Sequence, residues 1–473
     1  MDLDPEQFAG REFLLVPDHV MLRDGPVGDH ALLIADGKFR DVGNSADVMK
    51  RHPGLQAIRL EGKLVMPGFI DAHHHLTQSF GKALAFGEPS EIYRRIWVPL
   101  EGSLDDNLIA LTAKLAALEA LRGGFTTVVD AGTRAKGDTT AVAEAAKQVG
   151  LRCVLGFICN DLGGAEPRAQ RGEILKRAQA HLARWQSDGL IHPSLAISIP
   201  EAASDEMLRE VSSLCAEAGV IFQSHVNEHL AAVERSLVQR KQRPLEQLYH
   251  LGALGPHVLI AHGTLVTPFE LNMLRETNTA VAYNPVATQW KGNAVAPATM
   301  MAALGIRFGL GTDGTRSDGF RLLDAAEATQ RIAFGLEVGD FSCGAGWMWL
   351  EHATTAAAQA IGLAAITGEI AMGKQADFLI VDLDVPEMQP SWDLTWELVR
   401  LGNRDQIIGV FVAGRLRLWR GWPLDWDAKA LMRTVAKTAS AAVAAAPIQR
   451  IHDRSTEHRS KFQDKSWARS RTI

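Results

Sequence analysis

The sequence predicts an α/β protein in which a (β/α)8 barrel carries a small β-sandwich built from both ends of the chain. Strand-like and helix-like runs alternate through the middle of the sequence at roughly 30 to 45 residues, the rhythm of β/α units around a parallel sheet. Short strand-like runs separated by turns occur at both ends. Because neither end could bury a sheet face alone, we expect the two ends to meet in one β domain.

The β-sandwich is assigned to residues 1–65 and 366–425. Asp36-Gly37 lies between two strand-like runs and predicts a hairpin, because type I′ turns need positive φ. The strand-like runs of this domain are residues 13–16, 31–34, 39–42, 64–65, 377–381, 407–412 and 415–419. Residues 426–473 are expected to form an alanine-rich helix, over 427–446, and then a polar, mildly basic tail.

The barrel is assigned to residues 66–365, with its first strand just before three histidines. The other predicted strands are 126–130, 152–158, 194–198, 220–225, 258–262, 279–283 and 307–311, and helices are clearest over 103–122, 139–149, 173–186, 204–218 and 297–304. Residues 350–362 predict one further helix that ends at its glycine. In such a barrel, reactive groups collect at the C-terminal ends of the strands.

Composition excludes several classes of protein. At 473 residues, with 47% apolar and 22% charged residues, the chain is typical of a soluble globular enzyme. The net charge of −6 argues against a nucleic-acid partner, which needs clustered Lys and Arg. We expect no secretory signal and no membrane partner, since no apolar run is long enough to span a bilayer. The four cysteines lack C-x-x-C spacing, so we expect reduced thiols in the cytoplasm.

Three consecutive histidines end the first predicted barrel strand, in the run Pro67-Gly-Phe-Ile-Asp-Ala-His73-His-His75. Side chains alternate along an extended chain, so His73 and His75 should point together while His74 points away. Two imidazoles aimed the same way are half of a four-ligand site for a divalent transition metal. We therefore expect a metal at this strand end; the alternative is a surface loop that happens to be rich in histidine.

Other predicted strands also end in titratable residues: His225 ends the fifth, His262 the sixth, and Asp313 follows the eighth. Together with His73 and His75, His225 and Asp313 give three imidazoles and one carboxylate. This set suits one divalent ion per subunit, with Zn²⁺ favoured over Fe²⁺ or Mn²⁺, which would activate a hydroxide. His262 is expected to act on that hydroxide as a catalytic base or orienting donor, and Glu228 to protonate a ring nitrogen or the leaving amine. Alone, a strand-end histidine is more often structural, and Glu228 could simply sit at a helix N-terminus.

These motifs resemble the amidohydrolase superfamily, in particular its branch of chlorohydrolases and aminohydrolases that act on triazines, purines and related heterocycles. The resemblance spans about residues 13 to 422 and is carried by residues 67–75, His225-x-x-Glu228, Ala261-His262-Gly-Thr, Gly311-Thr-Asp313-Gly and 373–381. It implies that His73, His75, His225 and Asp313 bind the metal, that Asp313 also moves protons, and that Glu228 and His262 act on substrate and water. The lack of lysine in residues 194–204 implies one metal ion rather than two.

The segments that contact substrate in this family depart here from its usual pattern. Where many members have Pro-His-x-Pro-Tyr after the fourth strand, this chain has Ser198-Ile-Pro-Glu201, and residues 315–320 replace an asparagine-rich segment. We expect these changes to leave the metal chemistry intact and to alter the substrate. Candidate substrate-binding residues, each of which could instead be structural, are Gln78, Asn284, Trp290, Arg316 and Asp318.

The sequence thus predicts a mononuclear metal-dependent hydrolase, first of all an aminohydrolase (deaminase) of a purine, pterin, pyrimidine or s-triazine. The same site could instead open a cyclic amide or remove chloride, a reaction that needs no protonation of the leaving group. An alternative of another class is a catalytically silent barrel used in assembly, which the intact set of metal-site and base residues opposes. The resemblance implies a homodimer or larger homo-oligomer acting on a small molecule.

Overall fold

Eight parallel strands form the barrel of the computed structural model, which describes residues 3–88, 92–136, 138–162, 167–451, 457 and 459 (167–169 by their backbone alone). In chain order they are β6 (Phe69–His74), β7 (Phe125–Asp130), β8 (Arg152–Ile158), β9 (Ile191–Ile197), β10 (Phe222–Val226), β11 (Val258–His262), β12 (Ala280–Tyr283) and β13 (Phe308–Leu310). Each pairs with the next along the chain. Beyond β13, the Asp313 N–H donates to the carbonyl of His73 at 2.9 Å and brings the last strand back beside the first. The predicted barrel is confirmed.

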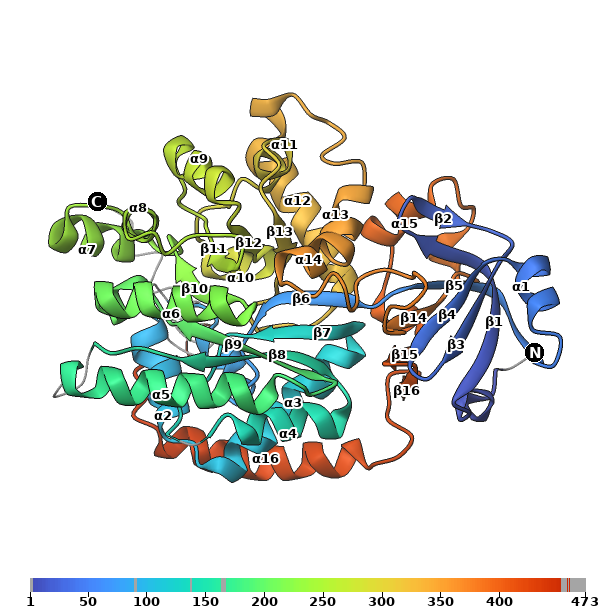
Figure 1. Cartoon of the computed structure of the whole chain (residues 1–473), viewed down its shortest axis with the longest axis horizontal. Coiled ribbons are helices and arrows are strands. Elements are labelled where there is room, and N and C mark those ends of the chain that lie inside the picture. Colours follow the sequence, from blue (N-terminus) through green and yellow to red (C-terminus); the bar gives the residue numbers. More distant parts are fainter. Residues whose placement is uncertain are drawn as a thin grey trace.

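Helices connect the strands and cover the outside of the barrel (Figure 1). They are α2 (Val98–Gly102), α3 (Asp106–Arg122), α4 (Thr140–Val149), α5 (Pro167–Trp185), α6 (Asp205–Ala218), α7 (Leu230–Arg240), α8 (Pro244–His250), α9 (Pro268–Thr277), α10 (Pro285–Lys291), α11 (Ala298–Ala303) and α12 (Gly319–Val338). Local signals set their ends: the Ser204 hydroxyl accepts from Met207 N at 3.2 Å to begin α6, and Gly219, with φ of 66°, ends it.

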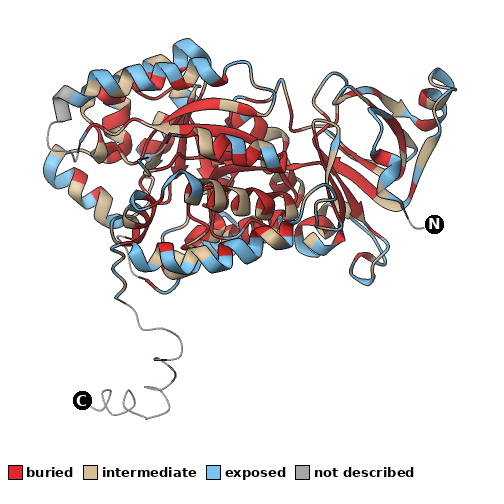
Figure 2. Ribbon diagram, turned by 90° about the horizontal axis from the view of Figure 1, so that it is seen from below, coloured by how far each residue is buried: buried red, intermediate tan, exposed pale blue. Residues whose placement is uncertain are grey.

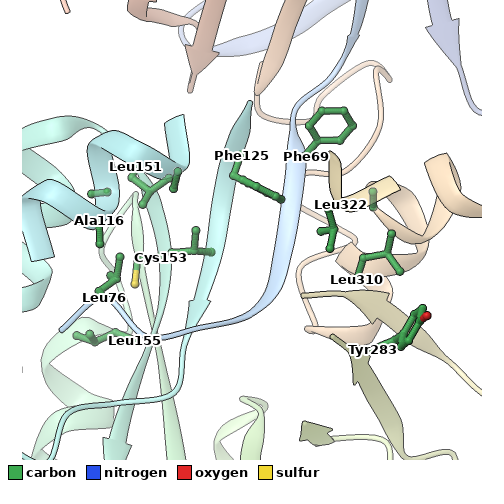
Figure 3. Packing of buried hydrophobic residues seen from close by; sticks show 14 of the residues in the cluster. Phe69, Leu76, Ala116, Phe125, Leu151, Cys153, Leu155, Tyr283, Leu310 and Leu322 are labelled. Carbon is green, nitrogen blue, oxygen red and sulfur yellow. The ribbon is translucent and has the colours of Figure 1, made fainter. Parts of the chain in front are cut away.

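The barrel core consists of large apolar side chains packed between the strands and the surrounding helices. Phe69 on β6 stacks edge-on against Phe320 of α12, with ring centroids 5.2 Å apart, and lies 6.1 Å from Phe125 on β7. Figure 3 shows Phe69 and Phe125 near one end of these strands, with Leu155 and Tyr283 farther along the barrel. Figure 2 shows the same buried centre beneath half-exposed helices. This packing holds in place the strands whose opposite, C-terminal ends carry the titratable residues.

Both ends of the chain contribute to the second sheet, as predicted. Its strands are β1 (Glu12–Leu22), β2 (Gly25–Val27), β3 (His30–Ala35), β4 (Lys38–Asn44), β5 (Ala57–Pro67), β14 (Phe378–Asp382), β15 (Ile407–Val412) and β16 (Arg415–Trp419), with α1 (Ser45–Arg51) after β4. The order is β16-β15-β14-β5-β1-β3-β4, and β2 pairs with β1. The predicted hairpin joins β3 to β4 through Asp36 and Gly37, whose φ angles are 50° and 77°.

A buried ion pair ties the barrel to the small β domain. Arg152, at the start of β8, donates from Nε to Asp377 Oδ2 at 2.8 Å and from NH2 to Oδ1 at 3.2 Å. Both side chains are essentially inaccessible to solvent. Asp377 Oδ1 also accepts from Ala413 N at 2.7 Å, so one carboxylate holds together β8, β14 and the turn before β16.

The chain after the second sheet returns to the barrel as α16 (Ala428–Ala445), close to the predicted helix 427–446, and packs beside α3 (Figure 1). The C-terminal strap, residues 446–451, then crosses the segment that follows β6. Gln449 N donates to Arg95 O at 2.9 Å, while the buried Glu88 carboxylate accepts from Arg450 Nε and Ile451 N, both at 3.1 Å. Most of the predicted polar tail, beyond residue 451, lies outside the described residues.

Two predictions for helices differ from the structure. The single helix expected over residues 350–362 is two short helices, α13 (Trp347–His352) and α14 (Thr355–Ala360), because Thr354, with φ of −135°, breaks the run between them. Residues 319–338, for which no helix is predicted, form the long helix α12, stabilised by tertiary packing of Phe320 and Leu323. The remaining elements are α15 (Leu394–Arg400), a π-helical turn (Tyr93–Trp97) and 3-10 turns at Pro5–Phe8, Lys82–Ala85, Pro200–Ala202, Pro386–Met388 and Arg404–Gln406. Among the described residues, no helix is both long and apolar enough to cross a membrane.

Candidate metal centre and active site

The strand ends bring the predicted titratable residues to one rim of the barrel. His73 lies on β6, His75 follows that strand, His225 lies on β10 and His262 ends β11. Asp313 follows β13. Apart from His225, which is partly buried, these side chains are less than a tenth exposed. Residues up to 240 positions apart in sequence thus share one small volume because parallel strands end at the same rim.

Four of these side chains surround a common point. Asp313 Oδ1 lies 3.4 Å from His73 Nε2 and 3.3 Å from His75 Nε2. His75 Nε2 is 3.2 Å from His225 Nε2. Four ligands bound tetrahedrally at about 2.0 to 2.1 Å would lie about 3.3 Å apart, so these separations suit a zinc-sized ion. His73 Nε2 has no hydrogen-bond partner within the described structure, as a ligand atom requires.

His262 is a fifth group beside this set. One ligand atom from each of His73, His225, His262 and Asp313 falls within 4.8 Å of the others, so His262 could replace His75 in a four-ligand group. The closer contacts favour His75, whose Nε2 meets both Asp313 and His225 at metal-ligand separations. His262 Nε2 faces Glu228 Oε2 instead, at 3.5 Å. This places His262 next to the ion site, facing the reacting groups.

Hydrogen bonds fix the orientation of the ligand side chains. His225 Nδ1 lies 2.7 Å from the carbonyl of Ser198, so Nδ1 carries the proton and Nε2 is free to bind a metal. His74 points away from the site, as the alternation predicts, with Nδ1 2.9 Å from Asp71 Oδ2. Asp71 Oδ1 accepts from Thr312 N at 2.9 Å. One buried carboxylate therefore holds the ends of β6 and β13 together beneath the ligands.

The backbone at the site adopts conformations that are uncommon for residues other than glycine. His262 has φ of 75° and Asp313 has φ of 57°. Such left-handed residues cluster where function requires a specific side-chain direction. Gly311 is required for a different reason: a Cβ there would lie 2.2 Å from Asn284 Oδ1 and 3.0 Å from the backbone nitrogen of His73. The Gly-Thr-Asp-Gly run is thus shaped by the approach of two neighbouring strands.

Lys291, the last residue of α10, joins the site, although the sequence analysis did not identify it. Its Nζ lies 2.6 Å from Glu228 Oε1 and 2.6 Å from Asp313 Oδ2. Only 8% of the side chain is exposed. His229 also reaches Glu228 Oε1, with Nε2 at 3.1 Å. In the structure, a buried lysine between two carboxylates clearly indicates a functional role. The sequence gives no such indication, because most lysines lie on the surface.

Charge and burial decide the protonation of the site. Burial, opposed by Asp313, lowers the pKa of His75 to about 4, and burial lowers that of His262 to about 3. Burial alone would raise the pKa of Glu228, but His262 and Lys291 hold it well below its usual range. Lys291 likewise outweighs burial and keeps the pKa of Asp313 well below its usual range. At neutral pH His75 and His262 are therefore neutral, and both carboxylates are ionised.

A cavity open to solvent lies against these groups. His75, His225, Glu228, Lys291 and Asp313 are among the residues that line it. The other lining residues include Tyr93, Arg94, Trp97, Arg134, Glu201 and Arg235. Glu201 accepts from Arg235 Nε at 3.0 Å and from NH2 at 2.8 Å, and from Arg94 NH2 at 3.1 Å. Aromatic and charged groups thus line a cavity that is open to solvent, as in sites that bind small molecules.

The predicted substrate-binding residues lie in different places. Gln78 lines the cavity and donates from Nε2 to Glu101 Oε1 at 3.3 Å. Asn284 is buried, and its Nδ2 lies 3.1 Å from His262 Nδ1, so it contacts the histidine. Trp290 donates from Nε1 to Thr315 Oγ1 at 3.1 Å and packs in a separate apolar cluster. Arg316 and Asp318 pair with each other at 3.5 Å, and Asp318 begins α12.

A comparison with known families matches residues 64–417 to the model of the amidohydrolase family. The chain belongs to the amidohydrolase family. The matched segment of this amidohydrolase runs from β5 to β16 and so contains the whole barrel. The family and the fold that the sequence predicts are therefore confirmed.

Similar amidohydrolases are named as deaminases. The 5-methylthioadenosine/S-adenosylhomocysteine deaminase of Thermodesulfovibrio yellowstonii is 26% identical over 425 residues, 87% of this chain and 94% of that protein. The 5'-deoxyadenosine deaminase of Methanopyrus kandleri is 30% identical over 384 residues, 80% of this chain and 86% of that protein. Deaminases hydrolyse carbon–nitrogen bonds, so these relatives agree with the predicted class of enzyme.

Solved structures of similar amidohydrolases share the fold. An adenosine deaminase from Xanthomonas campestris with bound zinc has a TM-score of 0.83 at 24% identity and covers 92% of this chain and 99% of its own. An atrazine chlorohydrolase from Arthrobacter aurescens TC1 in complex with zinc has a TM-score of 0.76 at 20% identity, covering 91% and 100%. At these identities, the likeness establishes the barrel with its small β domain.

Proposed function

We propose that this amidohydrolase is a mononuclear metal-dependent aminohydrolase that removes an amino group from a nitrogen heterocycle, with adenosine-type nucleosides as the first candidates. The observation that carries the proposal is the ring of His73, His75, His225 and Asp313 at metal-ligand separations, with Glu228 at the same end of an open cavity. The named activities of the relatives support the substrate class. A catalytically silent barrel would have no need to keep these groups buried and oriented.

The proposed metal is one Zn²⁺ per subunit, held by His73, His75, His225 and Asp313. The donor set of three neutral imidazoles and one carboxylate supports zinc, as does zinc in structurally similar proteins. When bound, such an ion lowers the pKa of a coordinated water towards ~7 and so supplies a nucleophile at neutral pH. The unpartnered Nε2 of His73 and the Nδ1–H of His225, fixed by Ser198, support this assignment.

The proposed proton transfers follow from which atoms face the cavity. Because Asn284 Nδ2 donates to His262 Nδ1, His262 carries its proton on Nε2 and can stabilise negative charge on an oxygen that adds to the ring carbon. Glu228 and Asp313 are ionised and accept the protons of the attacking water. Glu228 then delivers its proton to the ring nitrogen, Asp313 delivers the second proton to the amino group, and that group leaves as ammonia. Water and the amino compound thus yield the oxo compound and ammonia.

The test is ammonia release with metal content measured on the same preparation. The panel contains adenosine, 5'-deoxyadenosine, 5'-methylthioadenosine, guanine, an aminopterin, an aminopyrimidine and an aminotriazine. We expect release from at least one nucleoside and its loss in Asp313→Asn. Asp324→Asn is the matched control, because it makes the same change on the outer surface of α12.

Two outcomes would contradict the proposal. Stoichiometric metal without ammonia from any panel member would favour opening of a cyclic amide or dechlorination by the same residues. Failure to bind metal after reconstitution would exclude the metal-dependent mechanism.

We also propose a cytoplasmic homo-oligomer. The four cysteines are buried and free, as suits a reducing compartment. Ile332 and Leu336 on α12 are 86% and 93% exposed, and Phe341 beyond that helix is 80% exposed, which supports self-association through this face. Sedimentation velocity of the wild type and of Leu336→Lys tests the assembly: a variant of lower mass supports it, and a monomeric wild type contradicts it.

A further inference from the structure

The short helix α10 carries an orienting group at each end. Asn284, at its N-cap, contacts His262 Nδ1, and Lys291, its last residue, bridges Glu228 and Asp313. Gly292, with φ of 67°, ends the helix directly after Lys291. Between the two ends, Trp290 fixes the helix to the body of the protein through its hydrogen bond to Thr315. Lys291 therefore reaches the site from a rigidly held position.

The ammonium of Lys291 contacts one oxygen of each of the two carboxylates and leaves the other oxygen facing the site. It donates to Oδ2 of Asp313, while Oδ1 faces His73 and His75. It donates to Oε1 of Glu228, while Oε2 faces His262 Nε2. Without Lys291, Asp313 Oδ2 would lose this partner and Glu228 Oε1 would be held by His229 Nε2, at 3.1 Å, so each carboxylate would be freer to rotate and exchange its two oxygens. Lys291 also lines the cavity, so its action takes place next to the substrate.

We propose that Lys291 is a positioning residue that fixes which oxygen of Glu228 and of Asp313 faces the reaction. The proposal rests on the aminohydrolase function proposed above. Its effect comes from two N–H donors held by one side chain, at 2.6 Å from each carboxylate. A competing explanation is that Lys291 only balances charge or only helps to retain the metal, and the experiment below separates these roles.

The first measurement compares steady-state kinetics and metal content of the zinc-loaded wild type, Lys291→Met and Lys291→Ala. Misplacing reacting groups by about 1 Å costs on the order of 10²-fold in rate, so we expect kcat to fall about 100-fold in Lys291→Met. KM should stay within about threefold and metal content should not change. Lys147→Met is the matched control, because Lys147 pairs with Glu144 and Asp188 on the surface.

Amine rescue of Lys291→Ala separates hydrogen bonding from charge. We expect methylammonium to restore part of kcat in a saturable manner, because it supplies N–H donors, and tetramethylammonium, which supplies the charge alone, to restore none. Equal recovery with both cations would overturn the positioning role. So would a kcat of Lys291→Met within threefold of wild type, or a fall in kcat that disappears when the lost metal is replaced.

Crystal structures of wild type and Lys291→Met decide the question independently of turnover. Rotation of the Glu228 or Asp313 carboxylate in the variant would support the proposal, and unchanged orientation of both would overturn it. If the wild type releases no ammonia from any substrate, the proposed function fails, and the structures still test the role of Lys291.

Discussion

The ion pair between Arg152 and Asp377 gives the sharpest prediction about stability. Replacing Asp377 by alanine leaves the Arg152 guanidinium buried without its carboxylate, since both side chains are inaccessible to solvent. Removing one partner of a buried pair costs about 3 to 5 kcal/mol, because the remaining charge is neither hydrated nor paired. Asp377→Ala also leaves Ala413 N without its acceptor. We expect a loss of about 4 kcal/mol, moderated by the bonds that Arg152 keeps to Gly189 O and His192.

The matched control lies on β14, the strand that Asp377 directly precedes. Asp382 on β14 pairs with Lys63 on β5 at 2.9 Å, but this pair is partly exposed. Exposed pairs contribute at most about 1 kcal/mol, so Asp382→Ala should have a small effect. The double variant Arg152→Met with Asp377→Leu should lose less than Asp377→Ala alone, because it leaves no unpaired buried charge.

Urea unfolding followed by circular dichroism and tryptophan fluorescence measures these differences. From the highest urea concentration at the midpoint to the lowest, we expect the order wild type, Asp382→Ala, the double variant and Asp377→Ala. A midpoint of Asp377→Ala equal to that of Asp382→Ala would refute the reasoning that burial makes this pair essential to the junction.

Three further predictions concern the site. Glu228→Gln should lower kcat by about 10² to 10⁴-fold with unchanged metal content, since it removes the proton carrier; steady-state kinetics within tenfold of wild type would contradict this role. His73→Ala should weaken metal binding at least ~100-fold by chelator competition, whereas His74→Gln, which keeps a donor towards Asp71, should retain the metal. Glu88→Ala should raise KM about tenfold, because it removes both hydrogen bonds of Glu88 to the C-terminal strap and its pairing with Arg95 and so frees the strap from the cavity wall; kcat should change little, and an unaltered KM would show that the strap does not support the wall.

The barrel and the cluster of histidines and aspartate at its rim could be predicted because their signals are local. Apolar strands followed by His225, His262 or Asp313 are visible in short windows of sequence, and parallel topology places all strand ends at one rim. The alternation of side chains correctly predicts that His74 points away from His73 and His75. These conclusions need only strand period, residue type and the order of elements along the chain.

The orienting residues could not be predicted because they depend on tertiary packing. Lys291 lies in a polar run, Gln289-Trp290-Lys291-Gly292, which reads as a surface turn until α10 is placed against the barrel rim. Arg316, by contrast, follows Asp313 closely in sequence, yet its side chain pairs with Asp318 beside α12. Beyond the end of a strand, a residue that lies close in sequence to a residue of the site need not line the cavity.

The C-terminal strap lies beyond the segment matched by the family model, yet it contacts the wall of the cavity. The family match ends at residue 417, whereas the strap begins at 446 and contacts Arg95, in the turn that supplies Tyr93 and Trp97 to the cavity wall. A segment outside the residues that line the cavity is thereby coupled to the shape of the pocket. Substitutions or fusions at this end of the chain offer a way to tune substrate preference while leaving the reacting groups unchanged.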